Sequence, residues 1–414
     1  MQKQVLDSSN HFKDSQKADK NLEAPIALSI GGGMEQLPFI KAAVEKGWNV
    51  IAVDQDENAV GMKSATESYP INIVNQEEVI DLATRKQVQF VLPSPIGRYL
   101  TTVGAVNTAL GLNGVSLEQA EISVDKVRYN TFLKAHTIAC ANQICVRGKE
   151  AIRSAIHEIG FPCILKPRFG SGSRGVVVVT DAATCELCVQ EHMFGVGGEG
   201  DSLIESLLSG EEHGLDVLFV SGKPYIMALR KKYITPLPYR QELGYISVSH
   251  EGNQVLHRML EKLAKAFGVN NAVMHMDLFF SEEGQSVTVI ESSFRSSGYA
   301  ITERMLDHIL GTSAISFIME AIFTGCMPEL PKKEPVVYGL FFPNLQGSVI
   351  SEIKPFPSSA NILGNTLTIR PGDEITIIRN GTDAMGHGYV LLRGENEAEV
   401  LQLYQEIIDC YVCT

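Results

Sequence analysis

The sequence lacks the features that mark membrane-spanning, secreted or nucleic-acid-binding proteins. It has no run of about 18 or more apolar residues, so we expect no membrane-spanning helix. Basic residues are not in excess, because 35 lysines and arginines stand against 48 acidic residues, for a formal net charge of −13. A nucleic-acid surface needs clustered Lys and Arg, so nucleic acid is not an expected partner. Residues 1–24 are polar and without an apolar segment, so we expect a leader or packed arm rather than a secretory signal.

The composition is that of a globular protein with more than one domain. The chain has 414 residues, of which 44% are hydrophobic and 20% charged. The sequence has two C-x-x-C pairs, Cys185/Cys188 and Cys410/Cys413, which are far apart along the chain. A zinc site requires converging ligands, and nothing in the sequence shows that the two pairs converge. We therefore expect reduced thiols in a cytoplasmic protein.

The first part of the chain alternates between strand and helix patterns. Apolar residues from Pro25 lead into Gly31-Gly32-Gly33, a helical segment covers Gln36–Lys46, and strands are expected at Asn49–Val53 and Gln87–Leu92. This order predicts a parallel sheet with helices on its faces. The glycines also resemble a dinucleotide fingerprint whose third glycine is replaced by Gln36, so a dehydrogenase stays open. The alternative is a tight turn into a helix N-terminus that faces a small anion.

A lysine and a glycine-rich loop follow in the middle of the chain. The strand Phe161–Pro167 carries Lys166 near its end, and residues 169–175 form a Gly/Ser/Arg loop before the strand Val176–Thr180. No G-K-[ST] motif is present, so this is not a P-loop. Such a hairpin can cover a triphosphate with its N–H groups and hydroxyls, or it can be an ordinary surface hairpin.

Two carboxylates are predicted to face each other on neighbouring strands. Asp277 lies in the expected strand Ala272–Phe280, and Glu291 ends the next strand, Ser286–Ile290. Hairpin pairing places both acids on one face, where they repel each other unless a cation lies between them. Hard carboxylate oxygens favour Mg²⁺, while the alternative is a pair of solvent-facing strand acids.

The C-terminal part is predicted to be rich in short strands. We expect strands at Val336–Phe342, Thr366–Ile369, Glu374–Arg379 and Gly388–Leu392, and a final helix from an Asn396 N-cap to Ile408. A helix is also expected at Gln254–Phe267.

The order of these motifs resembles the ATP-grasp superfamily of carboxylate–amine ligases, and within it the L-amino acid (dipeptide) ligase branch. The resemblance covers about residues 25–414. It is carried by six stretches, namely Ser29–Pro38, Asp125-Lys126, Leu165–Val176, Glu205–Glu212, His275–Asp277 and Ile290–Arg295.

The resemblance implies a fold and a division into domains. The fold class is α/β and α+β, with an N-terminal Rossmann-like sheet at 25–118 after a polar leader at 1–24. A central ATP-grasp domain then covers 119–330, with a nucleotide-closing subdomain at about 138–208, and a small C-terminal α+β lid covers 331–414.

The resemblance also implies roles for individual residues. Lys126 and Lys166 resemble the lysines that hold the α- and β-phosphates, and Glu212 the acid that binds ribose. The nucleotide loop corresponds to Gly170, Ser171, Gly172, Ser173 and Gly175, and the adenine hinge to Glu205, Ser206, Leu207 and Leu208. The metal ligands correspond to Asp277, Glu291 and Ser293, where the family usually has Asn at the last position.

A catalytic role is implied for Arg295, which resembles an arginine that stabilises the acylphosphate. His275, two residues before Asp277, could face the same site and act in catalysis, and the alternative is a hydrogen-bonded core residue. Arg230, Lys231, Lys232 and Arg240 could recognise a substrate carboxylate or phosphate, or form a solvated basic loop.

The activity implied is the ATP-dependent, ADP-forming joining of a small-molecule carboxylate to an amine through an acylphosphate, with ATP and Mg²⁺ (or Mn²⁺) as cofactors. The resemblance allows a homodimer. The alternatives are an ATP-grasp carboxylase, a purine-pathway-type ligase, and a nucleotide-binding regulator without catalysis.

Overall fold

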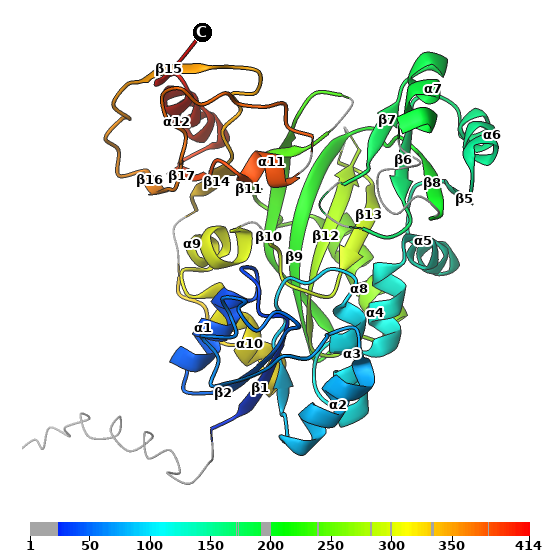
Figure 1. The fold of residues 1–414 in the computed structure, drawn as a ribbon, viewed down its shortest axis with the longest axis vertical. Coiled ribbons are helices and arrows are strands. Elements are labelled where there is room, and N and C mark those ends of the chain that lie inside the picture. Colours follow the sequence, from blue (N-terminus) through cyan, green and yellow to red (C-terminus); the bar gives the residue numbers. More distant parts are fainter. Residues whose placement is uncertain are drawn as a thin grey trace, which may run out of the picture.

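The computed structural model describes residues 24–414, except 171, 173, 192–199, 238–239, 282–283, 299, 333–334 and 380. The expected leader at 1–24, apart from its last residue, lies outside the described residues. The loop residues Ser171 and Ser173 also lie outside them. Figure 1 shows an N-terminal sheet at the bottom, a long central sheet, and two smaller lobes at the top.

The N-terminal part is a parallel sheet with helices on both faces. Its strand order is β3-β2-β1-β4, and every pairing is parallel. The strands are β1 (Ile26–Ile30), β2 (Asn49–Val53), β3 (Glu67–Tyr69) and β4 (Phe90–Val91). Apolar residues of β1 and β2 pack against α1 (Leu37–Glu45) on one face and against α2 (Gln76–Arg85) and α3 (Leu100–Leu110) on the other. The predicted sheet is confirmed.

The backbone amides of the glycine turn after β1 all donate hydrogen bonds to groups of the N-terminal part. Gly31 N donates to Val53 O at 2.8 Å, and Gly32 N donates to Asp54 Oδ2 at 2.9 Å. Gly33 N donates to Gln36 Oε1 at 3.0 Å. The end of β2 and the Gln36 side chain take up these three donors, so the expectation that this helix N-terminus faces a small anion has no support in the hydrogen bonding. The dinucleotide alternative loses its donors for the same reason.

A long antiparallel sheet forms the centre of the molecule (Figure 1). Its order is β13-β12-β9-β10-β11-β14-β17-β16. The strands are β9 (Glu211–Val220), β10 (Lys223–Ile234), β11 (Glu242–Val248), β12 (Ala272–Phe280), β13 (Val287–Ser293), β14 (Val337–Phe341), β16 (Ile362–Asn365) and β17 (Val390–Gly394). The last three come from the C-terminal part of the chain, so they extend the same sheet.

Strand periodicity separates an apolar face of this sheet from a polar one. On β9, Leu215, Val217 and Phe219 join the main core under α8 (Gln254–Phe267), whose bounds match the prediction. Successive side chains of a strand point to opposite faces, so Glu212, Gly214 and Asp216 lie on the other face. The same alternation on β12 buries Met274, Met276 and Leu278 in the core and leaves the residues between them on the polar face.

A small four-stranded sheet forms the lobe at the upper right of Figure 1. Its order is β5-β8-β6-β7, with β5 (Gln143–Val146), β6 (Cys163–Pro167), β7 (Val177–Val179) and β8 (Ser202–Ser206). The sheet packs against α6 (Lys149–Ile159) and α7 (Ala182–Glu191) around a separate apolar core. That core includes Cys163, Cys185 and Cys188, so the C-x-x-C pair on α7 serves as buried packing. The helices α4 (Leu117–Val124) and α5 (Lys126–Ala135) connect this lobe to the N-terminal part.

The C-terminal part differs from the prediction in its strands. The predicted strands Thr366–Ile369 and Glu374–Arg379 are wrong, because both segments are irregular. Ile369 and Ile375 instead fill a small core with Ile350 and Tyr411, which explains their apolar spacing without a strand ladder. The observed elements are η2 (Ile301–Met305), α9 (Leu306–Leu310), α10 (Ala314–Thr324), β15 (Ile350–Ile353), α11 (Gly381–Met385), α12 (Glu397–Ile408) and β18 (Tyr411–Cys413). Asn396 caps α12 as predicted, accepting a hydrogen bond from Glu399 N.

Among the described residues, no single helix is both long and apolar enough to cross a membrane. Only the pair Ile301–Leu310 and Ala314–Thr324 reaches that length and apolarity together, and it is bent by 87°.

The close packing of α3 on α4 can be tested at a glycine. A Cβ on Gly104 would lie 2.6 Å from Ser116 O and 2.8 Å from Leu117 Cα. Overpacking of this kind typically costs about 1–3 kcal/mol, so we expect Gly104→Ala to lower the midpoint of thermal unfolding by several degrees. The matched control is Gly364→Ala, whose added Cβ meets Leu391 at an ordinary 3.7 Å. Equal midpoints for the two variants would contradict the close helix contact.

Candidate active site

Charged and polar side chains gather on the polar face of the long sheet. Asp277 on β12 pairs directly with Glu291 on β13 and with Gly214 on β9, which in turn pairs with Arg230 on β10. Residues in register on neighbouring strands lie side by side on the same face. The register thus places the acids Glu291 and Asp277 and the base Arg230 in one row across the sheet, with Gly214 between Asp277 and Arg230.

Two cavities lie over this row and share part of their walls. The first, with an empty volume of about 850 Å³, lies between the long sheet and the small-sheet lobe. The second, with about 840 Å³, lies between the long sheet and loops of the N-terminal part. Residues that line both are Glu242, Asp277 and Glu291. A group held by Asp277 and Glu291 is therefore in reach of both cavities.

Lys126 and Lys166 enter the first cavity from different elements. Lys126 is the first residue of α5, and its Nζ donates to Gly170 O at 2.9 Å. Lys166 on β6 forms an ion pair with Glu205 on β8 at 2.6 Å, and both side chains are less than one-tenth exposed. Burial, together with nearby Lys166, lowers the pKa of Lys126 from its ordinary value, although Glu291 and Glu205 oppose the shift.

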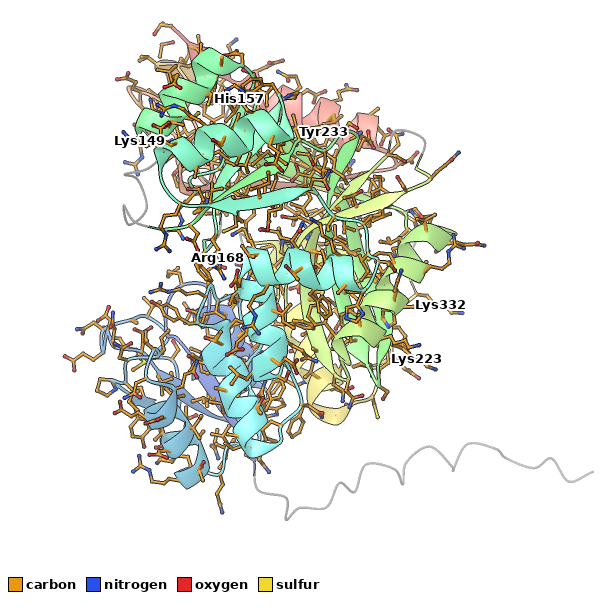
Figure 2. All side chains as sticks on the ribbon, turned by 90° about the vertical axis from the view of Figure 1, so that its right-hand side faces the viewer. Lys149, His157, Arg168, Lys223, Tyr233 and Lys332 are labelled. Atoms are coloured by element: carbon orange, nitrogen blue, oxygen red, sulfur yellow. The ribbon has the colours of Figure 1, made fainter. Side chains whose placement is uncertain are left out.

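An arginine joins the small-sheet lobe to the start of α5. Asp125 caps α5 by accepting from Val127 N and Arg128 N. Arg168, which follows β6, binds the same carboxylate with Nε at 2.9 Å and also binds Asp201 at 2.9 Å. Figure 2 shows Arg168 at the junction of the lobe with the rest of the chain. This contact holds Lys126 opposite Lys166.

Lys232 is the central cation of the site. Its Nζ lies 2.6 Å from Glu242 Oε1, 2.7 Å from Asp277 Oδ1 and 3.2 Å from Glu212 Oε1. Burial by itself lowers the pKa of Lys232, but the three carboxylates together hold it well above its ordinary value. Burial raises the pKa of Asp277 to about 7, with Glu242 and Glu291 adding to the effect and Lys232 opposing it. Arg240 completes the group by pairing with Glu212 at 2.8 Å.

Arg230 forms a fully buried ion pair beneath the second cavity. Its Nε and Nη2 donate to Asp216 Oδ2 at 3.0 and 2.6 Å, and the two residues are 0% and 1% exposed. Gly214 makes the room, because a Cβ there would lie 2.9 Å from Arg230 Nη1. The guanidinium also lies over the Tyr245 ring, with 5.2 Å from Cζ to the ring centroid.

His275 lines the second cavity, and its ring is in hydrogen-bond contact with Ser297. Its Nδ1 lies 2.9 Å from Ser297 Oγ, and its Nε2 lies 3.6 Å from Asp277 Oδ1. Burial, with the nearby charges of Arg295, Arg230 and Lys232, holds the pKa of His275 well below its ordinary value.

The structure brings together most of the residues singled out from the sequence. The first cavity is lined by Lys126, Lys166, Gly170, Glu205, Glu212, Asp277 and Glu291. The second is lined by Gly172, His275, Asp277, Glu291 and Arg295. Within the described part of the chain, five predicted residues line neither cavity: Gly175, Ser206, Leu207, Leu208 and Ser293. Ser171 and Ser173 lie outside the described residues.

The basic segment near residue 230 is neither a solvated loop nor a set of free anion receptors. Arg230 and Lys232 lie on β10 and point to the polar face, where carboxylates already neutralise them. Lys231 points the other way and pairs with Glu211 at 3.1 Å. The alternation of side chains along β10 separates Arg230 and Lys232 from Lys231. This pattern can be used only once the segment is known to be a strand.

No pattern in the sequence singled out Glu35, Asp216, Glu242, Tyr245 or Ser297. Glu35 and Ser297 come from loops that line the second cavity, and Glu242 and Tyr245 from β11. Only the pairing of strands that are distant in the sequence brings their carboxylates and hydroxyls to the site.

These observations agree with what comparisons with known proteins show. Residues 159–303 match the family described as the ATP-grasp domain. The chain therefore carries an ATP-grasp domain within an ATP-grasp fold, and the predicted resemblance is confirmed. The predicted class, ATP-dependent ligases that form C–N bonds, is confirmed at the level of this family.

Individual relatives are distant. The chain is 23% identical over 316 residues to the L-arginine-specific L-amino acid ligase of Bacillus subtilis, covering 73% of this chain and 75% of that protein. It is 23% identical over 269 residues to a formate-dependent phosphoribosylglycinamide formyltransferase of Wolinella succinogenes, covering 62% and 68%. A solved L-amino acid ligase from Bacillus licheniformis superimposes with a TM-score of 0.72 at 17% identity, covering 95% and 99%.

The Arg230–Asp216 pair makes a testable contribution to stability. Removing one partner of a buried pair leaves a charge without compensation, so we expect Asp216→Ala to lower the free energy of unfolding by about 3–5 kcal/mol. The apolar double variant Asp216→Leu/Arg230→Met should lose much less, because no buried charge remains. Urea unfolding measures both. Equal losses in the two variants would contradict the assignment of the pair as a buried charge pair.

Proposed function

We propose that this chain uses ATP and Mg²⁺ (or Mn²⁺) to convert a small-molecule carboxylate into an acylphosphate and transfers the acyl group to an amine, with amino-acid-like substrates on both sides. The observation that carries the proposal is the convergence of Lys126, Lys166, Asp277 and Glu291 on one cavity from four separate elements. Two ammonium groups beside two carboxylates suit a triphosphate and a divalent cation.

The first cavity is the proposed ATP site. Lys126 and Lys166 would neutralise the phosphates, and the loop at Gly170–Gly175 would cover them. Glu205 lines the cavity at the end of β8, and the segment Ser206–Leu208 continues from it, so these four residues would bind adenine. Glu212, held by Lys232 and Arg240, would bind ribose. The small-sheet lobe at about 138–208 is the proposed nucleotide-closing subdomain, between the N-terminal domain at 25–118 and the C-terminal one at 331–414.

The donor set at the junction of the cavities fits a hard divalent cation. Asp277 and Glu291 are in register on adjacent strands, and both of the close contacts of Asp277 with Lys232 and His275 fall on Oδ1. Oδ2 is therefore the oxygen we assign to the cation, with Glu291 opposite. Ser293 lines neither cavity, so its neutral hydroxyl would contribute only through a water molecule. A bound Mg²⁺ would supply charge neutralisation to the phosphoryl oxygens during transfer.

The second cavity is the proposed site of the carboxylate and the amine. Arg295 lines it, and a fixed cation at this point stabilises negative charge as it develops on the acylphosphate. The substrate carboxylate oxygen attacks the γ-phosphorus and releases ADP. The amine nitrogen then attacks the acyl carbon, the bond to the phosphate oxygen breaks, and inorganic phosphate leaves with loss of a proton from nitrogen.

The charge of the second cavity favours an amine over the alternative substrates. Its wall includes Glu35 and Glu242 in addition to the two proposed metal ligands, against the single guanidinium of Arg295 among the described lining residues. Glu35 and Glu242 would attract the cationic amino group of an amino acid, and Arg295 would attract its carboxylate. A bicarbonate anion or a phosphoribosyl group has no cationic group for the two acids. This is why an amine ligase is proposed ahead of a carboxylase or a purine-pathway-type ligase.

The nucleotide and metal assignments can be tested by truncation. We expect Lys166→Ala and Glu291→Ala each to lower kcat/KM for ATP-dependent phosphate release by at least about 100-fold, because each removes charge stabilisation in a closed site. Circular dichroism should show an intact fold. Lys223→Ala, at the far turn of the β9–β10 hairpin, is the matched control and should retain wild-type rates. Wild-type rates in either site variant would refute its role.

The reaction itself is tested by a screen of amino-acid pairs with ATP and Mg²⁺. Phosphate release should require both an acid and an amine, and mass spectrometry should detect their amide. Phosphate release that depends on bicarbonate alone would favour a carboxylase, and ATP binding without turnover for any pair would favour a regulator. Either result contradicts the proposal.

A further inference from the structure

A buried chain of hydrogen bonds runs from Asp216 to the face of the second cavity. Ser297 Oγ donates to Asp216 Oδ1 and lies 2.9 Å from His275 Nδ1. Asp216 and Ser297 are each 1% exposed, while the His275 side chain is 19% exposed. The chain thus begins in the interior and ends on an imidazole at the cavity wall.

The direction of each hydrogen bond follows from the proton inventory. The Asp216 carboxylate accepts two hydrogen bonds from Arg230 on Oδ2 and one from Ser297 on Oδ1. The hydroxyl of Ser297 has one proton, which goes to Asp216, and its oxygen then accepts from His275. This contact places a proton on Nδ1, so a neutral ring held in this way has a lone pair on Nε2.

The position of Ser297 is itself fixed by backbone contacts. Its carbonyl oxygen accepts from Thr302 Oγ1 at 2.7 Å, and the N–H of the preceding residue, Ser296, donates to Pro93 O at 3.2 Å. The turn after β13 is thereby tied to the end of β4 and to η2. A hydroxyl held this firmly can hold the imidazole ring in one orientation.

At the cavity, this series of hydrogen bonds ends beside several hydrogen-bond acceptors. Nε2 of His275 lies 3.6 Å from Asp277 Oδ1, and Glu242 borders the same cavity. A ligand group that carries N–H bonds fits between such acceptors, whereas a carboxylate or phosphate oxygen does not.

From this geometry we infer that Asp216 and Ser297 are positioning residues that hold His275 with Nε2 exposed, so that Nε2 accepts a hydrogen bond from the amine nucleophile and aims its nitrogen at the acyl carbon. The inference rests on the proposed function for the identity of the ligand. It assigns the hydrogen bonds from Asp216 through Ser297 to His275 a role in the second step, aminolysis of the acylphosphate, rather than in the formation of the acylphosphate.

The arrangement of the ring is tested by nitrogen NMR of protein labelled with ¹⁵N-histidine, with the His275 signal assigned from a His275→Gln variant. The wild type should show protonated Nδ1 and unprotonated Nε2. Ser297→Ala should lose this preference, and Ser297→Thr should keep it. The matched control is Ser296→Ala, because the Ser296 hydroxyl is buried and makes no hydrogen bond within the described part of the chain. A wild-type signal from protonated Nε2 would overturn the inference.

The role in aminolysis is tested by comparing two products. Hydroxylamine at molar concentration traps acylphosphates as hydroxamates without a bound position, whereas amide formation needs the amine in place. In Ser297→Ala, the ratio of amide to hydroxamate should fall about five- to tenfold, the effect of one lost hydrogen bond, with a raised KM for the amine. Ser296→Ala and Ser297→Thr should keep the wild-type ratio.

The outcomes separate this inference from the proposed function. An equal fall of both products in Ser297→Ala would mean a merely structural role and would overturn the inference. A wild-type chain that forms no hydroxamate with any carboxylate would overturn the proposed function and with it the place of the amine, while the NMR spectrum decides the hydrogen-bond chain independently.

Discussion

The site depends on one buried ammonium group. Lys232 reaches Glu242, Asp277 and Glu212 within 3.2 Å, and its side chain is 2% exposed. Without this cation, three acids and the adjacent Glu291 would repel one another in a setting where burial already disfavours their charged forms. Each of the three carboxylates borders a different proposed subsite, for ribose, for metal and for substrate. The ammonium therefore determines the spacing between these subsites as well as their charge.

A second constraint is the joint between the small-sheet lobe and the rest of the chain. Lys166 belongs to the lobe, whereas Lys126 starts α5 outside it. Arg168 bridges them through Asp125, the residue that caps α5. The proposed phosphate site is shared by both bodies, so movement of the lobe would open or close it, and closure would exclude water from an acylphosphate. The buried Arg230–Asp216 pair, by contrast, belongs wholly to the long sheet.

Much of the fold could be predicted from local pattern. The parallel N-terminal sheet, the helix Gln254–Phe267 and the strand Ala272–Phe280 have strong periodicity, and all three are present. The two wrong strands, Thr366–Ile369 and Glu374–Arg379, have apolar residues that fill a small irregular core, which a pattern cannot distinguish from a strand face. The glycine turn at Gly31–Gly33 was misleading for a similar reason, because Asp54 and Gln36 take up its amides from outside the motif.

The sequence by itself determined the candidates for the chemistry: Lys126, Lys166, Asp277, Glu291 and Arg295 stand in an order and spacing that resemble the ATP-grasp superfamily. Only the tertiary structure decided what Lys232, Glu242, Asp216 and Ser297 do. Their partners lie on other strands and loops, and strand register sets which side chains meet. Pairing between distant strands depends on packing of the whole sheet, so no short segment encodes it.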